Sequence, residues 1–135
     1  MKSILLVEDS TFIRLATERA LTKAGYRVIS AYDGEQVLRV AQERLPDLIL
    51  LDMLLPKLGG PEILRGLKND PTTSNIPVIV LSSLSQKNEA RLKKDGACAY
   101  FEKSKLCLDP DFIALLEVIK GALIQTEAQT LKLPT

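Results

Sequence analysis

Residues 48–52 read Leu-Ile-Leu-Leu-Asp, four aliphatic residues that run directly into a carboxylate. An aliphatic run of this length, without polar residues at alternate positions, is typical of a strand that is covered on both faces. The pattern recurs near the start of the chain, where residues 3–7 read Ser-Ile-Leu-Leu-Val and are followed by Glu8 and Asp9. Both runs predict buried strands with acidic side chains at their carboxyl ends.

Three further segments resemble strands. Residues 26–31 are rich in β-forming side chains, and residues 77–81 form an apolar run that ends at Ser82. Residues 98–101 give a weaker signal and are followed shortly by Lys103. The chain therefore predicts five strands, four of which end close to a polar side chain that could carry chemistry.

Helix-forming segments separate these strands. The first begins after Ser10 or Thr11 and ends before Gly25; others are expected over 35–44, 61–68 and 86–94, and a last one opens at Asp109-Pro110. Two helices carry apolar residues at helical spacing, namely Phe12, Ile13, Leu15, Ala16, Ala20 and Leu21 in the first, and Phe112, Ile113, Leu115, Leu116, Ile119 and Leu123 in the last. Asp33-Gly34 is expected to form a turn. This alternation of strands and helices predicts an α/β fold, with a parallel sheet and helices on both faces.

The carboxyl ends of parallel strands lie on one edge of the sheet, where ligands of open α/β folds bind. Glu8, Asp9, Asp52, Ser82 and Lys103 are therefore predicted to meet there. Close carboxylates repel each other by about 4 kcal/mol per pair at an effective dielectric of about 20. A divalent cation is the simplest compensation, so the sequence favours a metal site at this edge.

The composition excludes several classes of function. The 135-residue length suits one domain, and the absence of histidine excludes a Ser-His-Asp triad, a Cys-His pair, a His-ligated metal and a phosphohistidine carrier. The net charge of +1 gives no indication of a nucleic-acid partner, and no apolar stretch approaches the roughly 20 residues that span a bilayer. Cys98 and Cys107 lack metal-ligand spacing and are interpreted as inert reduced thiols, which favours a cytoplasmic location.

Four motifs, in this order and spacing, resemble the receiver (CheY-like) domain of two-component response regulators. They are ILLVEDS at 4–10, LILLDMLLP at 48–56 followed by Gly59-Gly60, IPVIVLSS at 76–83 and GACAYFEKS at 96–104. The resemblance covers about residues 3–125 and implies a flavodoxin-like, doubly wound (βα)5 fold with strand order 2-1-3-4-5. It implies one receiver domain over 1–127, with 128–135 as a C-terminal tail or the start of a linker.

The resemblance also implies a Mg²⁺ site. Asp9 and Asp52 match the metal ligands of the family, together with the backbone carbonyl of Leu54. Glu8 matches the second acidic position, which typically holds metal-bound water. A hard cation with oxygen ligands can neutralise phosphoryl oxygens.

Four residues match the phosphorylation machinery of the family. Asp52 matches the phosphoacceptor, and Lys103 matches the lysine that pairs with the phosphoryl oxygens. Ser82 and Tyr100 match the two switch residues, although Tyr100 also fits a packed aromatic without a switching role. The family usually has proline after the lysine, and here Ser104 stands in its place, which leaves the path of the 104–108 loop open.

The function implied is a phosphorylation-dependent switch, which receives a phosphoryl group from a histidine kinase or phosphotransfer protein. It would alter binding of a downstream protein through the face formed by the helix at 86–94, the strand at 98–101 and the last helix. Catalysis would be limited to self-phosphorylation and autodephosphorylation. We expect no direct binding of nucleic acid or membrane, and the sequence leaves a homodimer open.

Two alternatives from other classes remain. An aspartate-nucleophile phosphatase of the haloacid dehalogenase type would carry a second Asp two residues after its nucleophile, where this chain has Leu54. A flavodoxin-like nucleotide-binding module would need a phosphate-binding loop rich in Ser, Thr or Gly after the first strand. Glu8 and Asp9 would repel a phosphate there unless a metal intervened.

Overall fold

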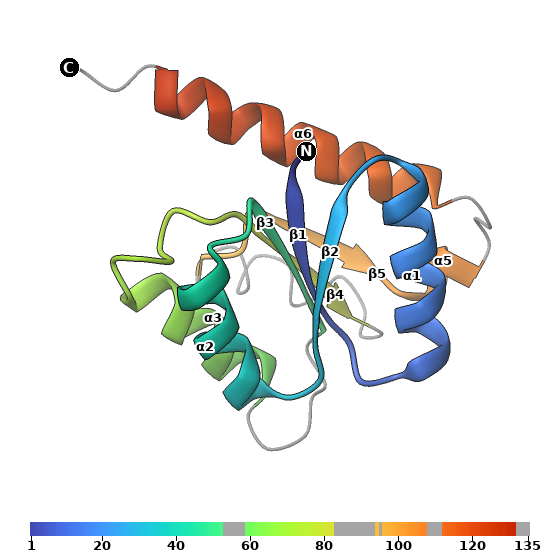
Figure 1. The fold of residues 1–135 in the computed structure, drawn as a ribbon, viewed down its shortest axis with the longest axis horizontal. Helices are drawn as coiled ribbons and strands as arrows, with labels where there is room; N and C mark the ends of the chain where they lie inside the picture. Colours follow the sequence, from blue (N-terminus) through green and yellow to red (C-terminus); the bar gives the residue numbers. More distant parts are fainter. Residues whose placement is uncertain (53–58, 83–93, 95, 108–111, 132–135) are drawn as a thin grey trace.

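Five parallel strands form a single sheet in the order β2-β1-β3-β4-β5 in a computed structural model of the chain (Figure 1). They are β1 (Ser3–Val7), β2 (Arg27–Ala31), β3 (Leu48–Asp52), β4 (Val78–Ser82) and β5 (Ala99–Glu102). The predicted fold class and strand order are confirmed. The structure describes residues 1–52, 59–82, 94, 96–107 and 112–131, and of residues 106–107 and 128–131 only the helical backbone.

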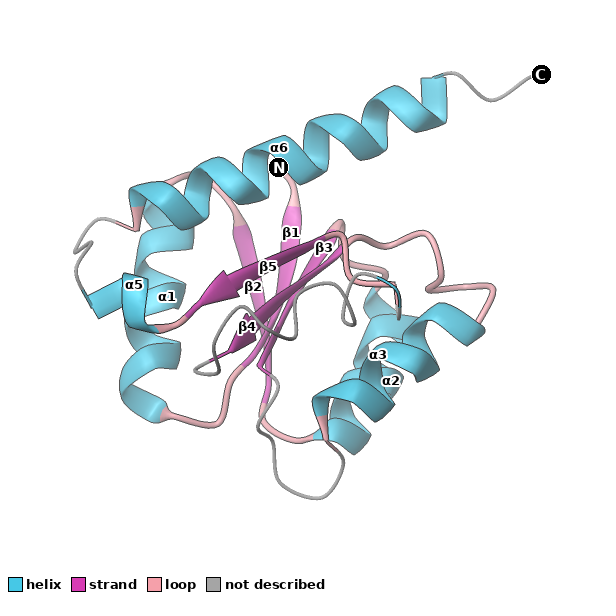
Figure 2. Ribbon diagram, turned by 180° about the vertical axis from the view of Figure 1, so that it is seen from behind, coloured by secondary structure: helices cyan, strands magenta, loops and turns pink. Residues whose placement is uncertain are grey.

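The described helices cover both faces of the sheet (Figures 1 and 2). They are α1 (Thr11–Lys23), α2 (Gly34–Arg44), α3 (Gly60–Asn69), the short α5 (Ser104–Cys107) and α6 (Ile113–Leu131). Helices α1 and α6 pack on one face, and α2 and α3 pack on the other. The helix predicted over 86–94 lies almost entirely outside the described residues.

Each central strand supplies side chains to both cores, which explains the unbroken aliphatic runs. In β1, Leu5 and Val7 contact the α2 and α3 side, whereas Ile4 and Leu6 contact the α1 and α6 side. All four side chains are completely buried. Burying an aliphatic side chain of this size contributes about 1.5–3 kcal/mol, so the two cores hold the strand ends firmly in place.

The helix ends follow local rules of capping. The Ser10 side chain caps α1 by accepting a hydrogen bond from the backbone N–H of Ile13 at 3.5 Å, and Gly25 follows the helix with a φ of +99°. Asp33 caps α2 by accepting from the N–H of Gln36 at 3.0 Å. The prediction that Asp33-Gly34 forms a turn was therefore wrong in part, because Gly34 is already the first residue of α2.

The apolar residues of α1 do not form one buried stripe. Phe12 is 83% exposed and Leu15 is half exposed, although both occur in the predicted apolar pattern. Thr17, by contrast, is buried, and its hydroxyl donates a hydrogen bond to the carbonyl of Ile13 at 2.7 Å. A hydroxyl satisfied within its own helix packs much like an apolar group, so Thr17 completes the face that contains Leu21.

The last helix starts later and ends later than the sequence indicates. It begins at Ile113 rather than at Asp109-Pro110, which lies outside the described residues, and it continues to Leu131. Ile113 was predicted on the inner stripe and is instead exposed, because it stands on the opposite side of the helix from Leu115 and Ile119. Lys2 Nζ lies 2.8 Å from a carboxylate oxygen of Glu127, which ties the last turns of α6 to the start of β1.

The backbone after β5 passes from Lys103 directly into α5 without a cis peptide bond. The path of the 104–108 loop, which the sequence left open, is therefore helical as far as Cys107.

In the part of the chain that the structure describes, no helix combines the length and the apolar character required to cross a bilayer.

Candidate functional site at the carboxyl ends of the strands

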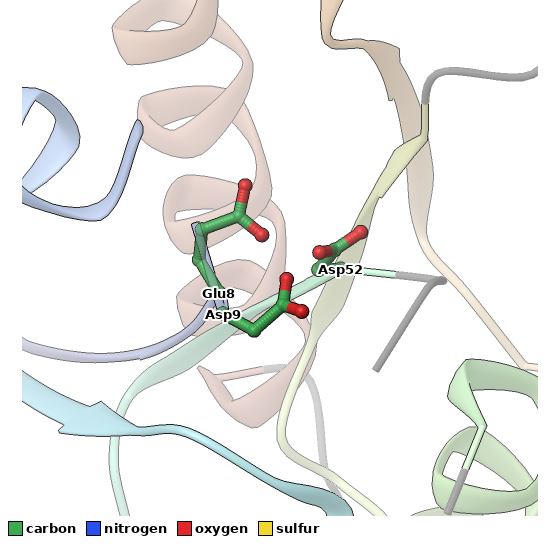
Figure 3. A group of neighbouring side chains, drawn as sticks. All are labelled: Glu8, Asp9 and Asp52. Carbon is green, nitrogen blue, oxygen red and sulfur yellow. The ribbon is translucent and has the colours of Figure 1, made fainter. Parts of the chain in front are cut away.

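Three carboxylates meet where β1 and β3 end. The two strands are neighbours, and their register pairs Val7 with Leu51, so the residues that follow come together. The side-chain oxygens of Glu8, Asp9 and Asp52 include one from each residue that lies within 4.8 Å of the others. Figure 3 shows the three carboxyl groups turned toward one another. The structure therefore brings the three carboxylates together at this edge of the sheet, as the sequence predicted.

Two of the three carboxylates are buried. Glu8 has no exposed surface and Asp52 is 2% exposed, whereas Asp9 is exposed at the mouth of the site. A buried carboxylate without a compensating charge is costly, because the solvation lost on burial is not replaced. The site therefore needs positive charge from within the protein or from a bound cation.

Lys103 supplies part of that charge. Its Nζ lies 2.9 Å from Asp52 Oδ2 and 2.7 Å from Glu8 Oε1, and it donates a hydrogen bond to Glu8 Oε2 at 3.0 Å. The backbone fixes this position, since the N–H of Lys103 donates to the carbonyl of Ser82 at 2.8 Å where β4 and β5 end. The bridge from Lys103 to Glu8 was not anticipated. The signal available in the sequence was the presence of opposite charges at the ends of strands in one sheet.

The charges of the site do not cancel. With all three carboxylates ionised, the single ammonium leaves a formal charge of −2, and with Glu8 protonated the formal charge is −1. Burial, followed by the adjacent Asp52 carboxylate, raises the pKa of Glu8 to about 7, and the opposing effect of Lys103 is smaller. Burial tends to lower the pKa of Lys103, but its contacts with Glu8 and Asp52 raise that pKa overall.

The donor set fits a hard divalent cation such as Mg²⁺. All the candidate ligands are oxygens, and Glu8 Oε1 is buried without a hydrogen-bond partner among the described residues. Lys103 Nζ is close to this oxygen but directs its hydrogen bond to the other one. The fourth predicted ligand, the carbonyl of Leu54, lies outside the described residues.

The two predicted switch residues lie on neighbouring strands. Ser82 ends β4 and is 2% exposed, one residue beyond the register partner of Asp52. Tyr100 lies on β5 beside Val80 and is half-buried against the core formed with α2 and α3. This placement of Tyr100 is compatible both with a switching ring and with a packed aromatic.

The comparisons with known proteins agree with this arrangement. The response regulator receiver domain matches residues 4–107. The chain belongs to this family. It is therefore a signalling module of two-component systems, and a phosphorylation-dependent switch is the function that the family supports. Such domains bind Mg²⁺ at an acidic site, as the cluster of Glu8, Asp9 and Asp52 would allow.

Curated relatives share the domain but differ in length. The chain is 47% identical over 105 residues to a gliding motility regulatory protein of Myxococcus xanthus, covering 76% of this chain and 13% of that protein. It is 35% identical to the polar-differentiation response regulator DivK of Brucella anthropi, covering 76% and 84%. It is 42% identical to the transcriptional regulatory protein AfsQ1 of Streptomyces coelicolor, covering 62% and 36%. The chain thus spans a small part of the first and third relatives.

Solved structures are similar over nearly the whole chain. A CheY-like response regulator receiver domain protein from Methanospirillum hungatei has a TM-score of 0.82 at 29% identity, covering 96% of this chain and 98% of that one. The receiver domain of the sensor histidine kinase PA1611 from Pseudomonas aeruginosa has a TM-score of 0.79 at 27% identity, covering 90% and 97%. A magnesium ion is coordinated in the active site cleft of that second structure.

Proposed function

We propose that Asp52 accepts a phosphoryl group from the phosphohistidine of a histidine kinase or phosphotransfer protein. The observation that carries this proposal is the position of Asp52, which ends a buried strand beside two further carboxylates and within 2.9 Å of Lys103 Nζ. Phosphoryl transfer depends mainly on positioning and on neutralising charge, and this site provides a nucleophile with charged groups already placed around it.

In the transfer step, a carboxylate oxygen of Asp52 forms a bond to phosphorus while the bond from phosphorus to the donor imidazole nitrogen breaks. The leaving imidazole takes up a proton, and Asp52 becomes an acyl phosphate. The ammonium group of Lys103, which pairs with Glu8 and Asp52 in this structure, would then also pair with the phosphoryl oxygens.

Mg²⁺ would be held by Asp9 and Asp52, with Glu8 beside it and the Leu54 carbonyl as a further ligand. When bound, this cation would neutralise negative charge on the transferring phosphoryl group. The net negative charge of the acidic cluster, and the Glu8 oxygen that accepts no hydrogen bond among the described residues, support this role. Catalysis by the domain would then be restricted to its own phosphorylation and dephosphorylation.

Phosphorylation would change the affinity for a partner protein through two switch residues. The Ser82 hydroxyl would donate a hydrogen bond to a phosphoryl oxygen, a contact that exists only in the phosphorylated state. Tyr100 would respond by moving inward, changing the face made by the segment 86–94, β5 and α6. The chain spans only 13% of the Myxococcus relative and 36% of AfsQ1, so the names of these longer proteins do not identify its kinase or its downstream partner.

We further propose that the receiver domain covers residues 1–127, that it acts in the cytoplasm and that it binds no nucleic acid directly.

The test is the mass of the intact protein after incubation with a small phosphodonor and Mg²⁺. We expect the wild type to gain one phosphoryl group, Asp52→Asn to gain none, and removal of Mg²⁺ by a chelator to prevent the gain. Asp47→Asn is the matched control, because Asp47 lies before β3 at the opposite edge of the sheet and should leave phosphorylation unchanged. Phosphorylation of Asp52→Asn at the wild-type level would contradict the proposal.

A further inference from the structure

The outer face of α6 carries a stripe that the rest of the described chain does not cover. Four exposed residues, Ile113, Glu117, Lys120 and Ile124, follow one another at intervals of four, three and four along the helix. This spacing places them in one line on a helix surface, as in the seam of a coiled coil. Ile113 and Ile124 end the stripe and are 57% and 55% exposed.

The helix also contains an exposed glycine beside the stripe. Gly121 stands in the middle of α6 and is exposed, and a Cβ atom built on it meets nothing within 4 Å. A glycine in a helix interior costs about 1 kcal/mol relative to alanine. Among the described residues, none occupies the space beside Gly121, which leaves room for a backbone that approaches from outside the molecule.

We propose that this stripe binds the same stripe of a second copy of the chain, with the two α6 helices antiparallel about a twofold axis. Ile113 and Ile124 lie equally far from the midpoint between residues 118 and 119, and so do Glu117 and Lys120. One axis through this midpoint therefore sets Ile113 against Ile124 of the second copy and Glu117 against Lys120 of the second copy. Such self-complementarity is what a twofold interface requires.

The charges select the antiparallel arrangement and the second copy as occupant. In a parallel pair, Glu117 would face Glu117 and Lys120 would face Lys120, and these like charges would repel. In the antiparallel pair, two oppositely charged contacts form at the centre, with an isoleucine pair at each end. Gly121 lies on the flank of the stripe, where the missing side chain would let the backbone of the second copy approach.

The proposed interface goes beyond the phosphorylation switch and leaves the acidic site open. Glu127, one turn past Ile124, is paired with Lys2 at the start of β1, the sheet edge opposite Glu8 and Asp52. Figures 1 and 2 show α6 on the outside of the fold, with one side turned away from the sheet. A contact of about three helical turns is at the small end of specific interfaces, so association should be reversible at high protein concentration.

Charge exchange tests the register. Sedimentation equilibrium of the wild type, from micromolar to millimolar concentration, should show a monomer–dimer equilibrium. Glu117→Lys alone and Lys120→Glu alone should each raise the dissociation constant by about tenfold or more, because each variant sets like charges against each other. An equimolar mixture of the two variants should dimerise again, as should the double variant E117K/K120E. All these positions are exposed, so circular dichroism should show unchanged folding.

A monomeric wild type over this range, single variants that still dimerise, or a mixture that stays monomeric would each overturn the proposal.

The variant Gly121→Ala provides an independent measurement. It should raise the midpoint of thermal unfolding, because alanine is the better helix former, while it weakens dimerisation by narrowing the space between the helices. If Gly121→Ala raises the midpoint and leaves dimerisation unchanged, the close approach of the two helices is wrong.

Discussion

The charged side chains at the two edges of the sheet differ in how their charges are paired. At the edge where the strands begin, Asp47 accepts hydrogen bonds from the backbone N–H of Ser3 at 2.7 Å and from its hydroxyl at 3.3 Å. Lys68, also at this edge, donates to the carbonyls of Ser74 and Ile76 at 3.1 and 2.7 Å. Neighbouring backbone groups pair with the charges of Asp47 and Lys68, and these contacts hold the adjoining segments in place.

At the edge where the strands end, three carboxylates lie close together, and Lys103 pairs with two of them, Glu8 and Asp52. Two of them are buried, and one oxygen of Glu8 lacks a hydrogen bond among the described residues. The comparison shows that the fold can satisfy its polar groups and does so at one edge, while it keeps an excess of negative charge at the other. A bound cation would offset this excess of negative charge, so we interpret this edge as the functional one.

The largest expected effect comes from removing the lysine of each edge. Lys103→Met leaves buried Glu8 and Asp52 without their ammonium and should lower the free energy of unfolding by about 3–5 kcal/mol. Lys68→Met removes hydrogen bonds from a half-buried ammonium to two carbonyls and should cost about 1.5–3 kcal/mol. Urea unfolding without divalent cations measures both. A larger loss for Lys68→Met would reverse the comparison.

Binding of Mg²⁺ should give the next largest effect. At about a hundred times its dissociation constant, a ligand that binds only the folded state raises the free energy of unfolding by about 2.7 kcal/mol. We expect this stabilisation in the wild type and a much smaller one in Asp9→Asn, which keeps the shape of the side chain but removes one ligand charge. Unfolding curves with MgCl₂, against NaCl at equal ionic strength, separate binding from screening. Equal stabilisation of both proteins would exclude Asp9 as a ligand.

The smallest effect is expected from Asp47→Asn at the structural edge. Asparagine keeps an oxygen that accepts from Ser3, so the loss should be about 1 kcal/mol or less. The stabilisation by Mg²⁺ should be the same as in the wild type. A variant that lost its response to Mg²⁺ would mean that the two edges are coupled, and the contrast between them would fail.

Much of the fold was predictable because local patterns agree with the tertiary structure. The aliphatic runs that end at Val7 and Leu51 are typical of strands covered on both faces, and Ser10 and Gly25 mark the ends of α1 by their own chemistry. Burial within a helix was less predictable. Thr17 is buried because its hydroxyl finds a partner in its own helix, which composition alone does not reveal.

The site was predictable in its members but not in its internal pairing. The strand ends bring Glu8, Asp9, Asp52 and Lys103 together for topological reasons that the order of the motifs reflects. The contact between Lys103 and Glu8 joins residues 95 positions apart, and its preference depends on side-chain rotamers and burial. No spacing rule in the sequence contains that information.

The central claim is that the acidic edge is built to receive a divalent cation. The most direct measurement is the anomalous diffraction of crystals grown with Mn²⁺, which takes oxygen ligands as Mg²⁺ does. We predict one anomalous peak in contact with carboxylate oxygens of Asp9 and Asp52, with Glu8 beside it and Lys103 still within reach of Asp52. Fully occupied crystals with no peak among these carboxylates, or with the ion bound only elsewhere, would contradict the account.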